Sequence, residues 1–154
     1  MNTPRLNVVL YQPEIPQNTG NIGRTCVATD SKLWIVRPAS FRLDDRRLRR
    51  SGLDYWQHLS WSDVSSWNEL QAESPPARTW LFSKRATRCY TDVAYQPGDF
   101  LVFGSETEGL PQTMIDEAGE RALRIPMSKN VRSLNLANSV AIVVYEAVRQ
   151  LNQS

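Results

Sequence analysis

Residues that build metal and disulfide sites are scarce in this sequence. The 154 residues include two cysteines, Cys26 and Cys89, and one histidine, His58. The cysteines lack the spacing of metal ligands, and a single histidine cannot supply a histidine-based dyad. We therefore expect reduced thiols, as in a cytosolic protein, and no metal ion.

Long hydrophobic runs and glycine-rich phosphate loops are also missing. The longest apolar run, Val140 to Tyr145, is far shorter than the roughly 20 residues that cross a bilayer. No basic segment followed by an apolar run opens the sequence, so we expect no signal peptide. Neither a Walker A sequence nor a glycine-rich dinucleotide fingerprint follows the first predicted strand. The sequence therefore predicts a cytosolic protein with no membrane span.

Lysine is scarce as well, because the basic residues are 15 Arg and only 3 Lys, and the net charge is +2. Arginine is suited to bidentate phosphate contacts and to stacking on bases. Five of the arginines lie between Arg42 and Arg50, in a run that also holds Asp44 and Asp45. Taken alone, such a run is more simply a solvated helix face with internal Asp–Arg pairs. An RNA-binding surface is the alternative.

What is present fits one globular domain spanning residues 1–154, with 41% hydrophobic and 22% charged residues. Apolar runs predict strands at residues 6–11, 33–37, 79–83, 100–103 and 122–125. Helices are predicted near residues 18–30, with Asn18 and Thr19 as caps, and at 44–52, 63–73, 111–118 and 136–151. Because strands and helices alternate, we expect an α/β fold with a mainly parallel sheet and helices on both faces.

The last predicted helix is apolar on more than one face. Its apolar residues at 137, 140, 141, 144, 148 and 151 follow the three-four spacing of a helix that covers a core. Ile142, Val143 and Tyr145 are apolar too, which predicts a second buried face. A partner subunit is the candidate to cover it.

Small and polar residues follow two of the predicted strands. Gly104 ends one strand and Gly109 turns the chain again, while Pro126 ends the strand that leads to Ile125. Ligands of open α/β sheets bind beyond the carboxyl ends of strands, and glycine allows close backbone approach. Each strand end alone is weak evidence. Both are followed by a cluster of polar residues that leads into the last helix and offers hydrogen bonds: Ser133, Asn135, Asn138 and Ser139.

Three segments together resemble the motifs of the SPOUT superfamily of RNA methyltransferases. They are residues 18–24 (NTGNIGR), 103–110 (FGSETEGL) and 125–127 (IPM) with 133–135 (SLN). More narrowly, residues 11–22, 44–55 and 144–147 resemble the minimal-length bacterial branch, the tRNA (cytidine/uridine)-2′-O-methyltransferases of the wobble position. The resemblance covers nearly the whole chain.

The resemblance implies a deep trefoil knot near the C-terminus, S-adenosylmethionine as the cofactor, and a homodimer with the last helix and the first-motif helix at its interface. The cofactor-binding residues would be Ser83, Gly104, Ile125 and Ser133, with Phe103, Met127 and Leu134 lining the adenine pocket. Glu106 is expected to tie its loop to backbone amides.

The resemblance also implies that Arg24 and Asn135 act at the acceptor ribose. Arg24 stays protonated, so it would orient the 2′-hydroxyl and stabilise developing charge rather than act as a base. The alternative for Arg24 is a salt bridge to Glu14 or Glu106. The dimer would bind tRNA through two basic clusters: Arg46, Arg47, Arg49, Arg50, Arg85 and Arg88.

Two other functions remain open at this point. One is a 2′-O-methyltransferase of the same fold that acts on rRNA or on another tRNA position. The other is a noncatalytic knotted RNA-binding module, which the intact Arg24, Gly104 and Ser133–Asn135 set disfavours.

Overall fold

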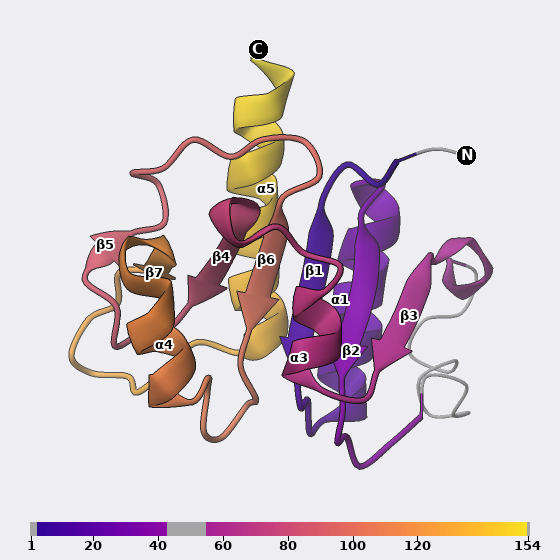
Figure 1. The fold of residues 1–154 in the computed structure, drawn as a ribbon, viewed down its shortest axis with the longest axis horizontal. Coiled ribbons are helices and arrows are strands. Elements are labelled where there is room, and N and C mark those ends of the chain that lie inside the picture. Colours follow the sequence, from indigo (N-terminus) through magenta and orange to yellow (C-terminus); the bar gives the residue numbers. More distant parts are fainter. Residues whose placement is uncertain (1–2, 43–54, 154) are drawn as a thin grey trace.

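The structure, a computed structural model, describes residues 3–42 and 55–153. Within these residues, seven strands form one sheet in the order β3-β2-β1-β6-β4-β7-β5 (Figure 1). All neighbouring strands are parallel, as the sequence predicted. The strands are β1 (Asn7–Tyr11), β2 (Lys32–Val36), β3 (Trp61–Val64), β4 (Thr79–Phe82), β5 (Arg88–Cys89), β6 (Phe100–Phe103) and β7 (Ala122–Arg124).

The central strands are continuous apolar runs, which is typical of a parallel sheet covered on both faces. All four residues of β4 and of β6 are buried, and β1 is buried up to Leu10. All five predicted strands are confirmed within one or two residues. The strands β3 and β5 were not predicted.

The prediction of a helix over residues 63–73 is wrong in its first part. Asp63 and Val64 belong to β3, which pairs with β2 through Ile35 and Val36. The helix α3 (Trp67–Gln71) begins only after Ser66, whose hydroxyl accepts a hydrogen bond from the Glu69 backbone N–H. A serine in this role is a strong helix start. The predicted helix at 44–52 lies outside the described residues.

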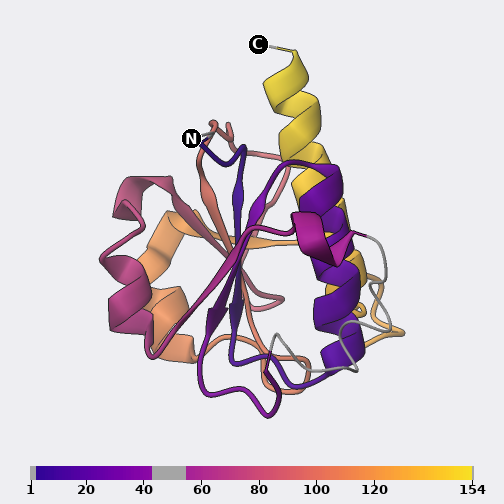
Figure 2. The ribbon, with the colours of Figure 1, turned by 90° about the vertical axis from the view of Figure 1, so that its right-hand side faces the viewer.

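Helices cover both faces of the sheet. Figure 2 shows α1 (Pro16–Ala28) and α5 (Leu136–Asn152) together on one face, with α3 and α4 (Gln112–Ala118) on the other. Short 3-10 helices lie at η1 (Trp56–His58), η2 (Pro76–Arg78) and η3 (Gly119–Arg121). The helices α1 and α5 pack directly against each other.

The start of α1 differs from the prediction. The helix begins at Pro16, in the first-turn position that suits proline, and Ile15 is its N-cap. Asn18 and Thr19, the predicted caps, are buried inside the helix. The helix α5 begins as predicted, and Asn135 caps it by accepting a hydrogen bond of 3.2 Å from the Asn138 N–H.

The final helix buries one apolar face in the core and leaves two large side chains outside. Val140, Val143 and Val144 are fully buried within the chain. Ile142 and Tyr145 are 37% and 51% exposed. The second apolar face therefore consists of Ile142 and Tyr145, and Val143 does not belong to it.

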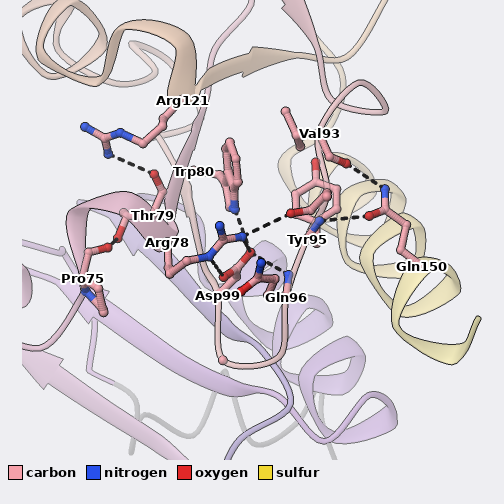
Figure 3. A network of polar contacts seen from close by, with 12 residues as sticks. Pro75, Arg78, Thr79, Trp80, Val93, Tyr95, Gln96, Asp99, Arg121 and Gln150 are labelled. Carbon is pink, nitrogen blue, oxygen red and sulfur yellow. Dashed lines mark hydrogen bonds and ion pairs between the residues drawn. The ribbon is translucent and has the colours of Figure 1, made fainter. Parts of the chain in front are cut away.

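A buried polar network fixes the amino ends of the strands (Figure 3). The Asp99 carboxylate, 1% exposed, accepts two hydrogen bonds of 2.7 Å from Arg78 and one of 2.8 Å from the Trp80 indole. On the helix α5, Gln150 accepts from the Tyr95 N–H and donates to the Val93 carbonyl. A buried carboxylate with this many donors is fully satisfied. The network thus anchors the connection that precedes β6 to β4 and α5.

Candidate active site

A cavity of about 650 Å³ lies beyond the carboxyl ends of β4, β6 and β7, at the end of the sheet opposite the Asp99 network. These strands are neighbours, so the loops that follow them meet there. All seven residues predicted to bind the cofactor line this one cavity: Ser83, Phe103, Gly104, Ile125, Met127, Ser133 and Leu134. The structure therefore brings the whole predicted set together, although the sequence spreads it over 52 positions, from 83 to 134.

The cavity has an aromatic wall. Phe82 ends β4 and Phe103 ends β6, and the two residues are directly paired across the strands. Their rings stack with centroids 4.8 Å apart and planes inclined by 10°. Ile125 and Met127 add apolar side chains from the third segment. The rest of the lining is largely polar or charged, so the cavity combines one apolar wall with many hydrogen-bonding groups.

Gly104 is required by the loop that follows it. A Cβ atom at this position would overlap the backbone of Gly109 and Leu110, because the loop folds back onto the strand end. The Gly109 N–H donates to the Ser105 carbonyl at 3.0 Å, and Gly109 itself has a φ of 69°. The backbone that approaches Gly104 closely is therefore that of its own loop, at Gly109 and Leu110.

Two glutamates join this loop to the start of α1. The Glu106 carboxylate accepts hydrogen bonds of 2.8 Å from the backbone N–H groups of Glu14 and Ile15. In return the Glu14 carboxylate accepts from the hydroxyl and the N–H of Thr107, at 2.7 and 3.2 Å. These hydrogen bonds hold the pKa of Glu14 below its ordinary value. The expected structural role of Glu106 is confirmed: it fixes the two backbone N–H groups that directly precede the first turn of α1.

Asn18 connects all three motif segments. Its side-chain amide donates to Glu106 at 3.3 Å, and its side-chain oxygen accepts from the Asn135 amide at 3.1 Å. Asn135 does not line the cavity itself, but its neighbours Leu134 and Leu136 do. The structure thus gives Asn135 two contacts, as the cap of α5 and as a bridge to α1, and its catalytic role stays a prediction.

Arg24 lies away from the cavity of its own chain. It is exposed on α1, with its guanidinium carbon 5.2 Å from the centre of the Tyr55 ring, and the Tyr55 hydroxyl donates to the Gly20 carbonyl. Burial raises the pKa of Tyr55, and the charge of Arg24 opposes that rise. The alternative of a salt bridge to Glu14 or Glu106 is wrong, because Arg24 forms no ion pair with either carboxylate. One chain therefore does not bring Arg24 to the predicted cofactor residues.

The two RNA-binding candidates in the described part of the chain use their donors internally. Arg85 donates to the Leu110 carbonyl and, at 2.8 Å, to the Gln112 side chain. Arg88 donates to the Glu120 carbonyl at 3.1 Å. Both arginines brace the chain around α4, and RNA binding by them stays a prediction. The other four candidates, Arg46, Arg47, Arg49 and Arg50, lie outside the described residues.

Sequence reasoning missed two basic residues that line the cavity. Lys84 directly follows the predicted Ser83, and Arg132 directly precedes the predicted Ser133. The signal was their adjacency to two predicted cofactor residues. Across residues 3–42 and 55–153, no group of His, Cys, Asp and Glu side chains is placed to hold a metal ion, and no helix is long and apolar enough to cross a membrane.

Comparison with known proteins agrees with this site. A model of the SpoU rRNA Methylase family matches residues 5–145. A tRNA (cytidine(34)-2'-O)-methyltransferase of Escherichia coli (strain K12) is 46% identical over 147 residues, which cover 95% of this chain and 94% of the relative. A solved structure described as "Structural insights into the 2-OH methylation of C/U34 on tRNA" has a TM-score of 0.89 at 40% identity, and the match covers 99% of this chain and 94% of that one.

A third similar protein was solved with a ligand. The SpoU methyltransferase AviRb from Streptomyces viridochromogenes, in complex with the cofactor AdoMet, has a TM-score of 0.84 at 25% identity. The match covers 97% of this chain and 59% of that one. Because the family model spans most of the sequence and the Escherichia coli relative aligns over nearly its full length, the resemblance seen in the sequence is confirmed, and the chain belongs to the SpoU rRNA Methylase family.

Proposed function

We propose that this protein transfers a methyl group from S-adenosylmethionine to the ribose 2′-oxygen of the wobble nucleotide, cytidine or uridine, of tRNA. The observation that carries the proposal is the 46% identity, over 94% of its length, to a relative named for this reaction on cytidine 34. The similar structure described for C/U34 of tRNA supports the same target. The second and third motif segments meet at one cavity, and hydrogen bonds of Asn18 join the first segment to both of them.

The cavity fits the proposed cofactor. Its volume of about 650 Å³ is in the range of pockets that enclose a ligand of this size, about 300–1,000 Å³. Phe82, Phe103, Ile125 and Met127 offer apolar contacts for the adenine, and Ser133 and Ser139 offer hydroxyls. When bound, S-adenosylmethionine supplies a methyl group that is already strongly electrophilic. The protein therefore needs mainly to position the 2′-oxygen and to exclude competing water.

We assign the acceptor role to Arg24 of a second chain. The helices α1 and α5 lie side by side on one face of the sheet (Figure 2), and Ile142 and Tyr145 stay exposed on α5. A homodimer that covers these side chains places α1 at the interface, where Arg24 of one chain faces the cavity of the other. A protonated arginine there orients the ribose hydroxyl and stabilises the developing alkoxide.

Three further features belong to the proposal. The segments around residues 103–111 and 124–136 form the trefoil knot that the SPOUT resemblance implies. The 154 residues act as one domain, and the protein works in the cytoplasm, where tRNA is found. An experimental structure in which the chain is not knotted would contradict the proposed trefoil knot.

The experiment follows labelled methyl groups into defined RNA. Purified protein is given cofactor labelled in the methyl group and tRNA transcripts that carry either ribose or 2′-deoxyribose at the wobble position. We expect incorporation only into the ribose form, with the product identified as a 2′-O-methylated pyrimidine by mass spectrometry. Incorporation into the deoxy form would move the target to another tRNA position, and incorporation only into rRNA would replace tRNA as the substrate.

A further inference from the structure

Three basic residues line the cavity: Lys84, Arg85 and Arg132. Arg85 donates its hydrogen bonds to the Leu110 carbonyl and to the Gln112 side chain. Lys84 and Arg132 are both exposed. Neither side chain forms an ion pair with an acidic residue in the described part of the chain.

The fold fixes Lys84 beside Arg132. Lys84 follows the end of β4, and Arg132 lies in the connection from β7 to α5, 48 positions later. The Lys84 ammonium donates a hydrogen bond of 3.4 Å to the Arg132 carbonyl oxygen. One contact to a neutral carbonyl leaves the charge of the ammonium and two of its three donors available. Two cationic residues thus line neighbouring parts of the cavity, and neither forms an ion pair within the described residues.

Neither acidic residue that lines the same cavity forms an ion pair with Lys84 or Arg132. Glu106 is occupied by the backbone N–H groups of Glu14 and Ile15. Glu108 is exposed on the loop after β6 and makes no ion pair with Lys84 or Arg132. An external anion is therefore the partner that the pair lacks.

We propose that Lys84 and Arg132 together bind one phosphodiester of the substrate RNA, the phosphate on the 3′ side of the target ribose. The inference rests on the proposed function, because it takes the cavity as the place where the methyl group is transferred. The 2′-oxygen and the 3′-phosphate are attached to adjacent carbons of one sugar. A ribose whose 2′-oxygen reaches the cavity brings this phosphate to its mouth. The guanidinium of Arg132 offers a planar fork for two phosphate oxygens, and Lys84 adds a point charge.

The test combines a neutral phosphate analogue with a protein variant. The substrate is an anticodon stem-loop RNA, made either with natural linkages or with one uncharged methylphosphonate 3′ to the wobble nucleotide. The variant is Lys84→Ala with Arg132→Ala. The matched control is Lys129→Ala, because Lys129 is an exposed cation of the same connection that does not line the cavity.

For the wild-type protein we expect the methylphosphonate to weaken RNA binding about tenfold or more, as loss of a charge-assisted contact does. The double variant should bind natural RNA with a similar loss, and should lose nothing further when the linkage is neutral. Its salt dependence should fall by about 0.7 in the log–log slope, the value for one phosphate of a single strand. Lys129→Ala should keep the full sensitivity to the methylphosphonate.

RNA binding is measured without cofactor, and cofactor binding is measured separately by calorimetry. A double variant that stays as sensitive to the neutral linkage as the wild type would overturn the proposal. So would a loss of cofactor affinity with unchanged RNA binding, since the pair would then hold the carboxylate of the cofactor. If the phosphate effect is present but the wild type transfers no methyl group to the wobble ribose, the proposed function fails and the phosphate contact stands.

Discussion

Asn135 donates a hydrogen bond of 3.1 Å from its side-chain amide to the side-chain oxygen of Asn18, 117 positions earlier in the chain. The same asparagine accepts the N–H of Asn138 with its side-chain oxygen. The side-chain oxygen of Asn135 therefore caps α5, and its side-chain amide links α5 to the start of α1. We call the second contact the tie. Substitutions of Asn135 can remove the tie and keep the cap.

Asn135→Asp should keep the cap and lose the tie, because aspartate has the oxygen but no amide donor. Asn135→Ala loses both, and loss of the cap costs about 1 kcal/mol of stability. We expect the aspartate variant to unfold near the wild-type denaturant concentration while its methyl transfer falls as far as that of the alanine variant. Denaturant unfolding and a methyl-transfer assay measure the two effects. Wild-type methyl transfer in Asn135→Asp would show that the contact with Asn18 is only structural.

Gly104→Ala should damage the loop before it affects any ligand. The new Cβ overlaps the backbone of Gly109 and Leu110, which cannot move away as a side chain would. We expect a loss of about 1–3 kcal/mol in the free energy of unfolding, with at least about tenfold weaker binding of S-adenosylmethionine.

Gly119→Ala is the control for Gly104→Ala. Gly119 has a φ of 58° but no atom near the position of a Cβ, so this change introduces backbone strain without a clash. It should destabilise the protein yet leave cofactor affinity unchanged. Wild-type stability in Gly104→Ala would mean that the loop relaxes freely, contrary to its packing.

Low pH should weaken the hydrogen bonds that Thr107 donates to the Glu14 carboxylate. Hydrogen bonds from Thr107 hold the pKa of Glu14 below its ordinary value of 4.5. A carboxylate whose pKa is lowered by folding stabilises the protein above the unfolded value, and this contribution is lost as the pH falls through the folded value. Glu14→Gln keeps an acceptor oxygen but does not titrate. Unfolding free energies should therefore fall less steeply below pH 4.5 in the variant than in the wild type; parallel curves would exclude Glu14 as a source of the acid sensitivity.

Arg24→Ala should lose methyl transfer about 100-fold or more while it binds cofactor normally, because Arg24 lies outside the cavity of its own chain. The lost contact with Tyr55 costs only about 0.5–1 kcal/mol. Calorimetry for the cofactor and single-turnover methylation of tRNA measure the two quantities. Near-normal turnover would remove Arg24 from the reaction.

Mixed dimers test which chain uses Arg24. Ser133→Trp fills the cavity from an exposed position, so the fold should tolerate it. A dimer of one Arg24→Ala chain and one Ser133→Trp chain should recover methyl transfer, since the open cavity then faces an intact Arg24. Each variant alone should stay inactive. An inactive mixed dimer would place Arg24 at the cavity of its own chain.

The sequence predicted the strands that lie in the middle of the sheet, because burial on both faces demands long apolar runs. It did not predict β3, an edge strand in which only Val64 of its four residues is buried. Asp63 and Val64 instead continued the amphipathic pattern of the residues that follow, so they were assigned to the same predicted helix as α3. The two-residue strand β5 carries too little pattern to be recognised.

The predicted cofactor residues came from the family resemblance, and the structure brings them together because the neighbouring strands β4, β6 and β7 end at the same cavity. The start of α1 was misplaced. Its N-cap, Ile15, makes no side-chain cap, and the backbone before the helix is held by Glu106, about 90 positions away, so Pro16 is the one local signal of the helix start. Likewise, the internal contacts of Arg85 depend on where α4 packs, and sequence distinguishes poorly between an arginine that braces the chain and one that binds phosphate.

The cavity also connects ligand binding to folding. Its walls come from residues 82–85, 103–109 and 125–139, so the binding site exists only when the last third of the chain has been made and has joined the rest. A ligand of this site recognises the completed fold and no earlier state. At a ligand concentration of 100 times its Kd, such selective binding would add about 2.7 kcal/mol to the stability of the native protein. Chains that have not finished folding receive none of this stabilisation, and in a cell they remain the ones open to proteolysis.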